Sequence, residues 1–230
     1  MVRTDVAPDE ANLILAEILF AKNSYPEAIQ QFWQILEKTP NNYRAFSKLV
    51  EMMRRSGTLS DAEAFFASAE KRNLKAKQEA GYHYCRGLYY RYTNKPNQAL
   101  VSFKNSRRDV EWGDKATCHM IELFLNPDND TVGGEVLEGV SEGNKLPGER
   151  EVEMAAVVAA EKLLKELPVS TPALRREVLE CHVMMATKQK LEIEGACQRF
   201  LKLLEREKEY VPALLVCVYF IRRVRANVIV

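Results

Sequence analysis

The stretch AIQQFWQI at residues 28–35 is echoed by AEAFFASA at residues 62–69, and 34 residues separate the two. A small, an aromatic and an apolar side chain recur at the same places: Ala28, Phe32 and Ile35 in the first stretch, and Ala62, Phe66 and Ala69 in the second. Self-similarity at a period of this length is typical of solenoids, in which each unit buries its apolar face against the next. The period therefore predicts a chain of stacked helical units.

A period of 34 residues is that of the tetratricopeptide repeat, a helix-turn-helix unit whose first and second helices are called A and B below. Its pattern has a small residue at position 8, Ala at 20, an aromatic at 24 and often Pro at 32. With position 1 at Asp9, these positions hold Ala16, Ala28, Phe32 and Pro40. Small residues let the two helices approach closely, and proline ends helix B. We expect an all-α fold, a tetratricopeptide-repeat solenoid of antiparallel helix pairs.

The same register continues along the chain and predicts about five repeats plus one unpaired helix in a single elongated domain, residues 1–230. The repeats are expected near residues 9–42, 43–76, 80–113, 114–170 and 177–210, with a partial repeat at 211–223. The fourth repeat is longer than the others, and its excess contains Asn-Pro, Gly-Gly and Pro-Gly dipeptides. These breakers predict an inserted loop at 126–149, between helices A and B.

Composition and charge limit the possible partners. Hydrophobic residues make up 47% of the chain and charged residues 28%, while 10 Gly and 9 Pro leave room for long amphipathic helices. A formal net charge of +1 gives no long-range field for nucleic acid, so no nucleic-acid partner is expected. The longest apolar stretch, residues 211–221, is well short of the roughly 20 residues that a membrane-spanning helix needs, so no direct membrane insertion is expected.

Two cysteine–histidine pairs are the best hint of a metal site. Cys118-His119 and Cys181-His182 occupy the same positions of successive repeats. Adjacent residues on a helix point in different directions, however, and no C-x-x-C or H-x-x-x-H spacing accompanies the pairs. Ordinary packing is the favoured interpretation, and no zinc is expected.

Other chemistry is also weakly supported. Asp128, Asp130 and Gly133 resemble the start of a calcium loop, but Val132 and Gly139 stand where further ligands are needed. No phosphate-binding, nucleophile-elbow or H-E-x-x-H motif is present, and three histidines provide few general bases. We expect no enzyme activity and no cofactor.

The A helices of a solenoid line its concave side, where partners usually bind. The side chains predicted to form this partner-binding groove are Arg44, Lys48, Arg54, Arg55, Tyr84, Leu88, Arg91 and Tyr92. Guanidinium groups beside tyrosine rings and a leucine suit an acidic, partly apolar peptide or helix. The alternative is a solvated face in a scaffold whose contacts lie elsewhere.

A stand-alone adaptor or co-chaperone that binds peptide tails is the alternative function. Repeat proteins of that kind grip a terminal carboxylate with Lys, Asn and Arg side chains on successive A helices. The corresponding positions here hold Leu13, Glu17, Lys48, Gly81 and Cys85. Glu17 would repel a carboxylate, so this alternative is less favoured.

Several stretches resemble a particular family, the tetratricopeptide repeat protein 21 family: NYRA at 42–45, AEKRN at 69–73, WG at 112–113, LNPDNDTVGGE at 125–135, AEKLLKEL at 160–167 and MATKQK at 185–190. The resemblance implies a fragment-length piece of a large peripheral subunit of intraflagellar transport complex A. It implies a non-enzymatic scaffold for retrograde ciliary transport and cargo trafficking, located in the cytoplasm and the cilium, at axoneme and basal body. The implied partners are other complex A subunits and ciliary membrane cargo or its adaptors.

Overall fold

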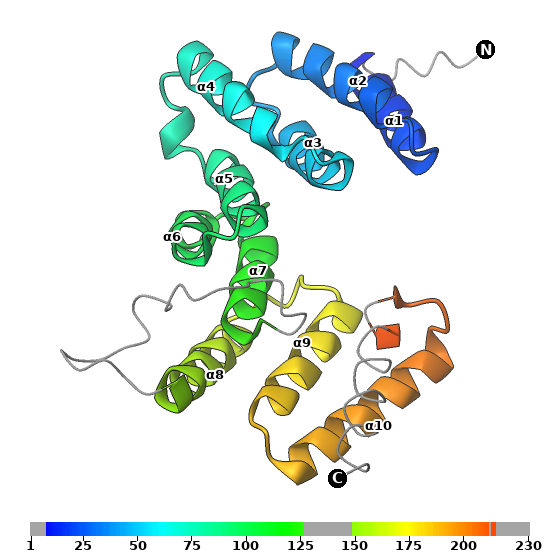
Figure 1. Cartoon of the computed structure of the whole chain (residues 1–230), viewed down its shortest axis with the longest axis vertical. Coiled ribbons are helices and arrows are strands. Elements are labelled where there is room, and N and C mark those ends of the chain that lie inside the picture. The colour runs from blue at the N-terminus through cyan, green and yellow to red at the C-terminus, as the bar shows by residue number, and fades with distance from the viewer. Residues whose placement is uncertain (1–7, 127–148, 212, 215–230) are drawn as a thin grey trace, which may run out of the picture. The chain divides into compact units, whose positions relative to one another are not determined.

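The computed structural model describes residues 8–126, 149–211 and 213–214, which belong to two compact units, residues 1–116 and 117–230. All regular elements within these ranges are helices, which confirms the all-α class (Figure 1). The first unit contains α1 (Pro8–Ala21), α2 (Tyr25–Lys38), α3 (Tyr43–Ser56), α4 (Ala62–Arg72), α5 (Ala80–Tyr92) and α6 (Pro96–Ser106). Helix α7 (Gly113–Leu125) begins in the first unit and ends in the second, which also contains α8 (Glu149–Lys165), α9 (Ala173–Ala186) and α10 (Lys190–Arg206).

The helices pack as consecutive pairs. In the first unit α1 packs on α2 and α5 on α6, and in the second unit α9 packs on α10 (Figure 1). Within the first unit α2 also contacts α3, and α3 contacts α5, so each pair stacks on the next. Paired contacts of this kind confirm the predicted stack of antiparallel helix pairs.

The side chains that revealed the period form the core. Ala28, Phe32, Ile35, Ala62 and Phe66 have no exposed surface. The close approach of helices is most evident in the third pair, where a Cβ atom placed on Gly87 would lie 2.5 Å from Cε1 of Phe103. A real Cβ atom does not come so near, so this position needs a residue without a side chain.

The turns between A and B helices share one conformation in the first three pairs. Asn23, Gly57 and Asn94 have φ values of 61°, 76° and 58°. This left-handed region favours glycine and tolerates asparagine. Caps also mark the helix starts, because the side chain of Asn42 accepts a hydrogen bond from the backbone N–H of Ala45 at 3.1 Å.

The second unit has its own core between α9 and α10. Its buried members are Val178, Cys181, Ala196, Phe200, Leu203 and Ala213. Helix α9 begins at Ala173, ahead of the expected repeat start at Glu177. Residues 127–148 of the predicted loop and 215–223 of the predicted last helix lie outside the described residues. In the described ranges no helix is long and apolar enough to cross a membrane.

Candidate partner-binding surfaces

All eight predicted groove residues lie on α3 and α5, two A helices that pack on each other. Arg44, Lys48, Arg54 and Arg55 are exposed on α3, and Arg91 and Tyr92 are half-buried at the end of α5. We call these six residues the α3–α5 surface. Five of them are cationic, which makes this part of the first unit basic.

The outer cations of this surface form exposed ion pairs within the unit. Nε of Arg44 donates to the carboxylate of Glu111, and Nζ of Lys48 lies 3.8 Å from Oε2 of Glu51. The side chains of Arg44 and Lys48 are 74% and 51% exposed. Exposed pairs of this kind contribute little to stability, so a partner can compete for either cation at small cost.

Two arginines of α3 stack on aromatic rings from neighbouring helices. The guanidinium carbon of Arg54 lies 4.5 Å from the ring centroid of Tyr92 on α5. That of Arg55 lies 4.8 Å from the ring centroid of Phe20 on α1. Burial raises the pKa of Tyr92, so its ring stays neutral and retains the negative π face that attracts a cation. These contacts position the two guanidinium groups while leaving both arginines at the surface.

Tyr84 and Leu88 correct the sequence prediction, because the structure places both in the core. The Tyr84 ring packs at 5.8 Å from Phe103 and 4.9 Å from Trp112, and Leu88 has no exposed surface. Helix α5 contacts α3 on one side and α6 on the other, so these positions face protein. They do not belong to the binding surface.

Two of the positions at which co-chaperone repeat proteins grip a terminal carboxylate, Gly81 and Cys85, are also buried. Gly81 is buried, and a Cβ atom there would lie 2.5 Å from the Tyr43 ring. Cys85 is fully buried, its thiol donates to the Tyr43 carbonyl oxygen at 3.5 Å, and burial raises its pKa. Neither position can contact a peptide carboxylate, which counts against the co-chaperone alternative.

A charged joint that the repeat pattern does not mark connects α4 and α5. Nη1 of Arg86 donates to both carboxylate oxygens of Glu63, at 2.9 and 2.8 Å, and its guanidinium carbon lies 4.4 Å from the Phe66 ring centroid. Its Nε donates to the Tyr82 hydroxyl at 3.2 Å, and that hydroxyl donates to Glu70. We call these five residues the Arg86 joint. The 34-residue pattern did not mark it, because the pattern contains apolar and small positions only.

The joint also shifts the pKa values of its members. The hydrogen bond from Lys77 and then that from Tyr82 hold the pKa of Glu70 below its ordinary value. Burial, followed by the hydrogen bond to Glu70, raises the pKa of Tyr82 to about 12. At neutral pH Glu70 is therefore an anion and Tyr82 a neutral donor, as their hydrogen bond requires. Because each member already has a partner within the joint, its role is to fasten α4 to α5.

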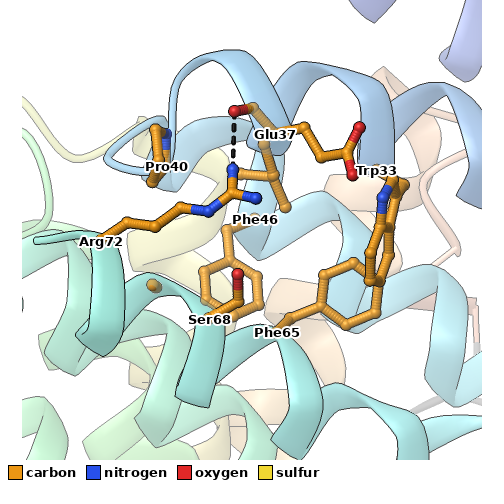
Figure 2. A pocket seen from close by; sticks show the side chains of 9 residues that line it. Trp33, Glu37, Pro40, Phe46, Phe65, Ser68 and Arg72 are labelled. Carbon is orange, nitrogen blue, oxygen red and sulfur yellow. Dashed lines mark hydrogen bonds between the residues drawn. The ribbon is translucent and has the colours of Figure 1, made fainter.

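A small apolar cleft opens between the B helices α2 and α4 (Figure 2). Trp33 stands at one side, with its ring centroid 4.4 Å from that of Phe65 and the ring planes inclined at 73°. On the other side Nη1 of Arg72 donates to the Glu37 carbonyl oxygen at 2.7 Å. Leu36, Phe46 and Ala69 also line this space, which we call the α2–α4 cleft. A tryptophan directly after the repeating aromatic position Phe32 is the sequence signal that could have revealed it.

The two cysteine–histidine pairs fall in the second unit. Cys118, Cys181 and His182 are buried, and Nδ1 of His119 lies 3.4 Å from Oε2 of Glu122. Arg175 also hydrogen-bonds to that carboxylate. Burial raises the pKa of Cys181 to about 12, which disfavours the thiolate that a metal would need. Among the residues that the structure describes, no group of three His, Cys, Asp or Glu side chains could hold a metal ion.

The stacked helix pairs define a helical-repeat protein of the tetratricopeptide class. Exposed arginines lie on α3, and an apolar cleft opens between α2 and α4. A solved structure supports this class. The crystal structure of a tetratricopeptide repeat protein from Parabacteroides merdae matches with a TM-score of 0.52, covering 95% of this chain and 75% of that one. The two sequences are 15% identical, so the match bears on the fold alone.

Sequence comparisons identify the family. Residues 9–125 match the family model described as the TT21 fifth ARM repeats domain. Tetratricopeptide repeat protein 21B of Xenopus laevis is 43% identical over 210 residues, which are 90% of this chain and 16% of that protein. The human protein of the same name is 47% identical over 173 residues, 74% of this chain and 13% of that protein. The chain belongs to the tetratricopeptide repeat protein 21 family and spans about one sixth of the length of such relatives.

Proposed function

We propose that this chain is a non-enzymatic protein-interaction scaffold of intraflagellar transport complex A, acting in retrograde ciliary transport and in the trafficking of ciliary cargo. In this proposal it works in the cytoplasm and in the cilium, at axoneme and basal body. Its partners are other complex A subunits and ciliary membrane cargo or adaptors. It requires no cofactor.

The observation that carries the proposal is the family match over residues 9–125. Those residues include the whole α3–α5 surface. The fold adds support, because stacked helix pairs expose long faces that suit protein partners. The chain spans only 13–16% of the relatives described above, and its partners are proposed from the family to which it belongs.

The α3–α5 surface is the contact that we propose for an acidic partner segment. Arg54 and Arg55 are held by stacking on aromatic rings, so less side-chain entropy is lost when a carboxylate binds them. Tyr92 adds a half-buried ring beneath the guanidinium of Arg54. An acidic helix or extended peptide with some apolar side chains is the partner that this combination fits.

Affinity purification tests the scaffold role. The tagged full-length parent protein is purified from ciliated cells, the bound proteins are cross-linked, and the cross-links are mapped. We expect complex A subunits, with cross-links from Lys48 on α3 to an acidic segment of a partner. Recovery of chaperones without complex A subunits would favour the adaptor alternative and contradict the proposal.

A further inference from the structure

The α2–α4 cleft is built entirely within the first unit, from α2, α4 and Phe46 of α3, and it shares no residue with the α3–α5 surface. Trp33 remains 41% exposed, although Phe32, its neighbour in sequence, has no exposed surface. Figure 2 shows Trp33 and Phe65 on one side of the cleft and Arg72 on the other, with Phe46 between them. Tryptophan and arginine at the edge of an apolar depression are the residue types that dominate binding energy at protein interfaces.

The size of the cleft limits what can enter it. The volume of this open cleft that the centres of water-sized molecules can occupy is only about 20 Å³. This is close to the space that a single water needs, and far below the ~300–1,000 Å³ of pockets for small molecules and cofactors. The end of one aliphatic side chain is therefore the largest group that the apolar part can accept.

The cleft lining holds one cation, Arg72, and one anion, Glu37, whereas exposed cations outnumber anions at the helix ends beside it. The last turns of α2 and α4, and the residues just after them, carry the exposed cations Lys38, Lys71, Arg72 and Lys75. The acidic residue on this rim is Glu37, whereas Glu70 forms an ion pair with Lys77 at 2.8 Å. Cations in a last helical turn also interact favourably with the helix dipole, and this interaction explains part of the clustering of cations at these helix ends. It does not account for an exposed tryptophan beside them.

We propose that the α2–α4 cleft is a second docking site, for an acidic peptide segment of a protein partner with one aliphatic side chain among its carboxylates. The aliphatic side chain enters between Trp33 and Arg72 and packs over Phe46 and Phe65. The flanking carboxylates bind Arg72 and the lysines of the two helix ends. Arg72 is already oriented by its hydrogen bond to the Glu37 carbonyl oxygen, and its planar guanidinium offers further N–H donors.

A fluorescein-labelled peptide of sequence EDELDE is the probe, and its fluorescence anisotropy is measured with the 230-residue chain. We expect saturable binding that weakens about tenfold when alanine replaces the leucine. Partial burial of an aliphatic side chain raises the binding affinity by about a factor of ten. A KRKLRK peptide should not compete. In a Trp112→Phe background Trp33 is the sole tryptophan, and its emission should shift to the blue as the cleft fills.

Amino-acid substitutions in the chain test whether the peptide binds in the α2–α4 cleft. Trp33→Ala should weaken binding about tenfold, and Ser68→Phe should block it by filling the cleft without changing any charge. Arg72→Glu should weaken binding and flatten its salt dependence. Lys104→Glu makes the same charge change at an exposed position of α6 and should leave the affinity within about twofold.

Three results would overturn this second site. One is equal affinity for the leucine and alanine peptides, which would mean attraction by charge alone. Another is unchanged binding by both Trp33→Ala and Ser68→Phe. The third is loss of binding on reversal of Arg54, Arg55 and Arg91 while Trp33→Ala has no effect, which would place the peptide on the α3–α5 surface. That last result would leave the proposed function standing and remove only the second site.

Discussion

Phe65 and Phe66 are neighbours on α4, yet they serve two different regions of the first unit. The Phe66 ring is fully buried in the Arg86 joint, 4.5 Å from the Phe46 ring and beneath the guanidinium of Arg86. The Phe65 ring faces α2, where its partner Trp33 is 41% exposed. The joint with α5 is closed and the cleft with α2 is open.

The arginines of the two regions differ in the same way. The Arg86 side chain is 19% exposed and binds both oxygens of Glu63, whereas Arg72 is exposed and donates to a backbone carbonyl. The polar groups of the Arg86 joint are hydrogen-bonded to one another, and the packing of its rings adds to stability. The open cleft has left apolar and cationic groups at the surface. The packing of the joint therefore contributes to stability, and the cleft is the region that we propose for binding.

Truncating one ring in each region should separate these roles most strongly. Phe66→Ala should lower the free energy of unfolding by about 3–5 kcal/mol, because a large cavity remains inside the joint. Trp33→Ala should cost about 1 kcal/mol or less, because the indole is partly in water already. Urea denaturation of both variants checks this. Similar losses from the two changes would contradict the division.

An added methyl group should distinguish the tightly packed α5–α6 pair from the looser α9–α10 pair. Gly87→Ala should destabilise the chain by about 1–3 kcal/mol, because the new Cβ would meet the Phe103 ring at 2.5 Å. Gly195→Ala on α10 is the matched control, since its Cβ would meet only the flexible end of Met184, at 3.1 Å. Helix propensity should then stabilise that variant by up to about 1 kcal/mol. Thermal melts that rank the two variants the other way would refute the packing argument.

The smallest effect concerns the pH dependence of the joint. The pKa of Glu70 lies below its ordinary value of 4.5 because Lys77 and Tyr82 bind its ionised form. The stability that ionised Glu70 contributes to the fold is therefore fully present above about pH 4.5, and it is lost as pH falls through the lowered pKa. Glu70→Gln should be slightly less stable than the parent at pH 7 and should lose less stability between about pH 5 and 3. Urea midpoints measured across that range test it, and parallel curves for the two proteins would contradict it.

The helix pairs could be predicted from the sequence, but the surfaces only in part. Ala28, Phe32 and Phe66 recur with the period and are fully buried, since stacking imposes the same packing in each repeat. Tyr84 and Leu88 were misplaced because a repeat position does not say which neighbouring helix covers it, and here Phe103 and Trp112 pack against Tyr84.

Features that depend on pairs of distant side chains could not be derived from the period. Arg86 meets Glu63 from the preceding repeat, and Trp33 meets Phe65, each across a helix boundary. Such contacts follow from the angle at which the helices cross. That angle is set by the whole interface and leaves no mark at a fixed sequence spacing.

We propose the α3–α5 surface as the partner contact of the scaffold, and charge reversal in the full-length parent protein tests that role most directly. The triple variant Arg54→Glu, Arg55→Glu, Arg91→Glu is compared with a control that reverses the exposed cations Lys95, Lys104 and Arg108. Breaking buried interfacial charge pairs costs about 2–5 kcal/mol and breaking rim pairs far less, so the size of the loss reports their depth. We predict that the triple variant recovers fewer complex A subunits in a pull-down and shows weaker salt dependence, with unchanged helix content, while the control behaves as the parent. Equal recovery of these subunits by all three proteins would contradict the role of this surface.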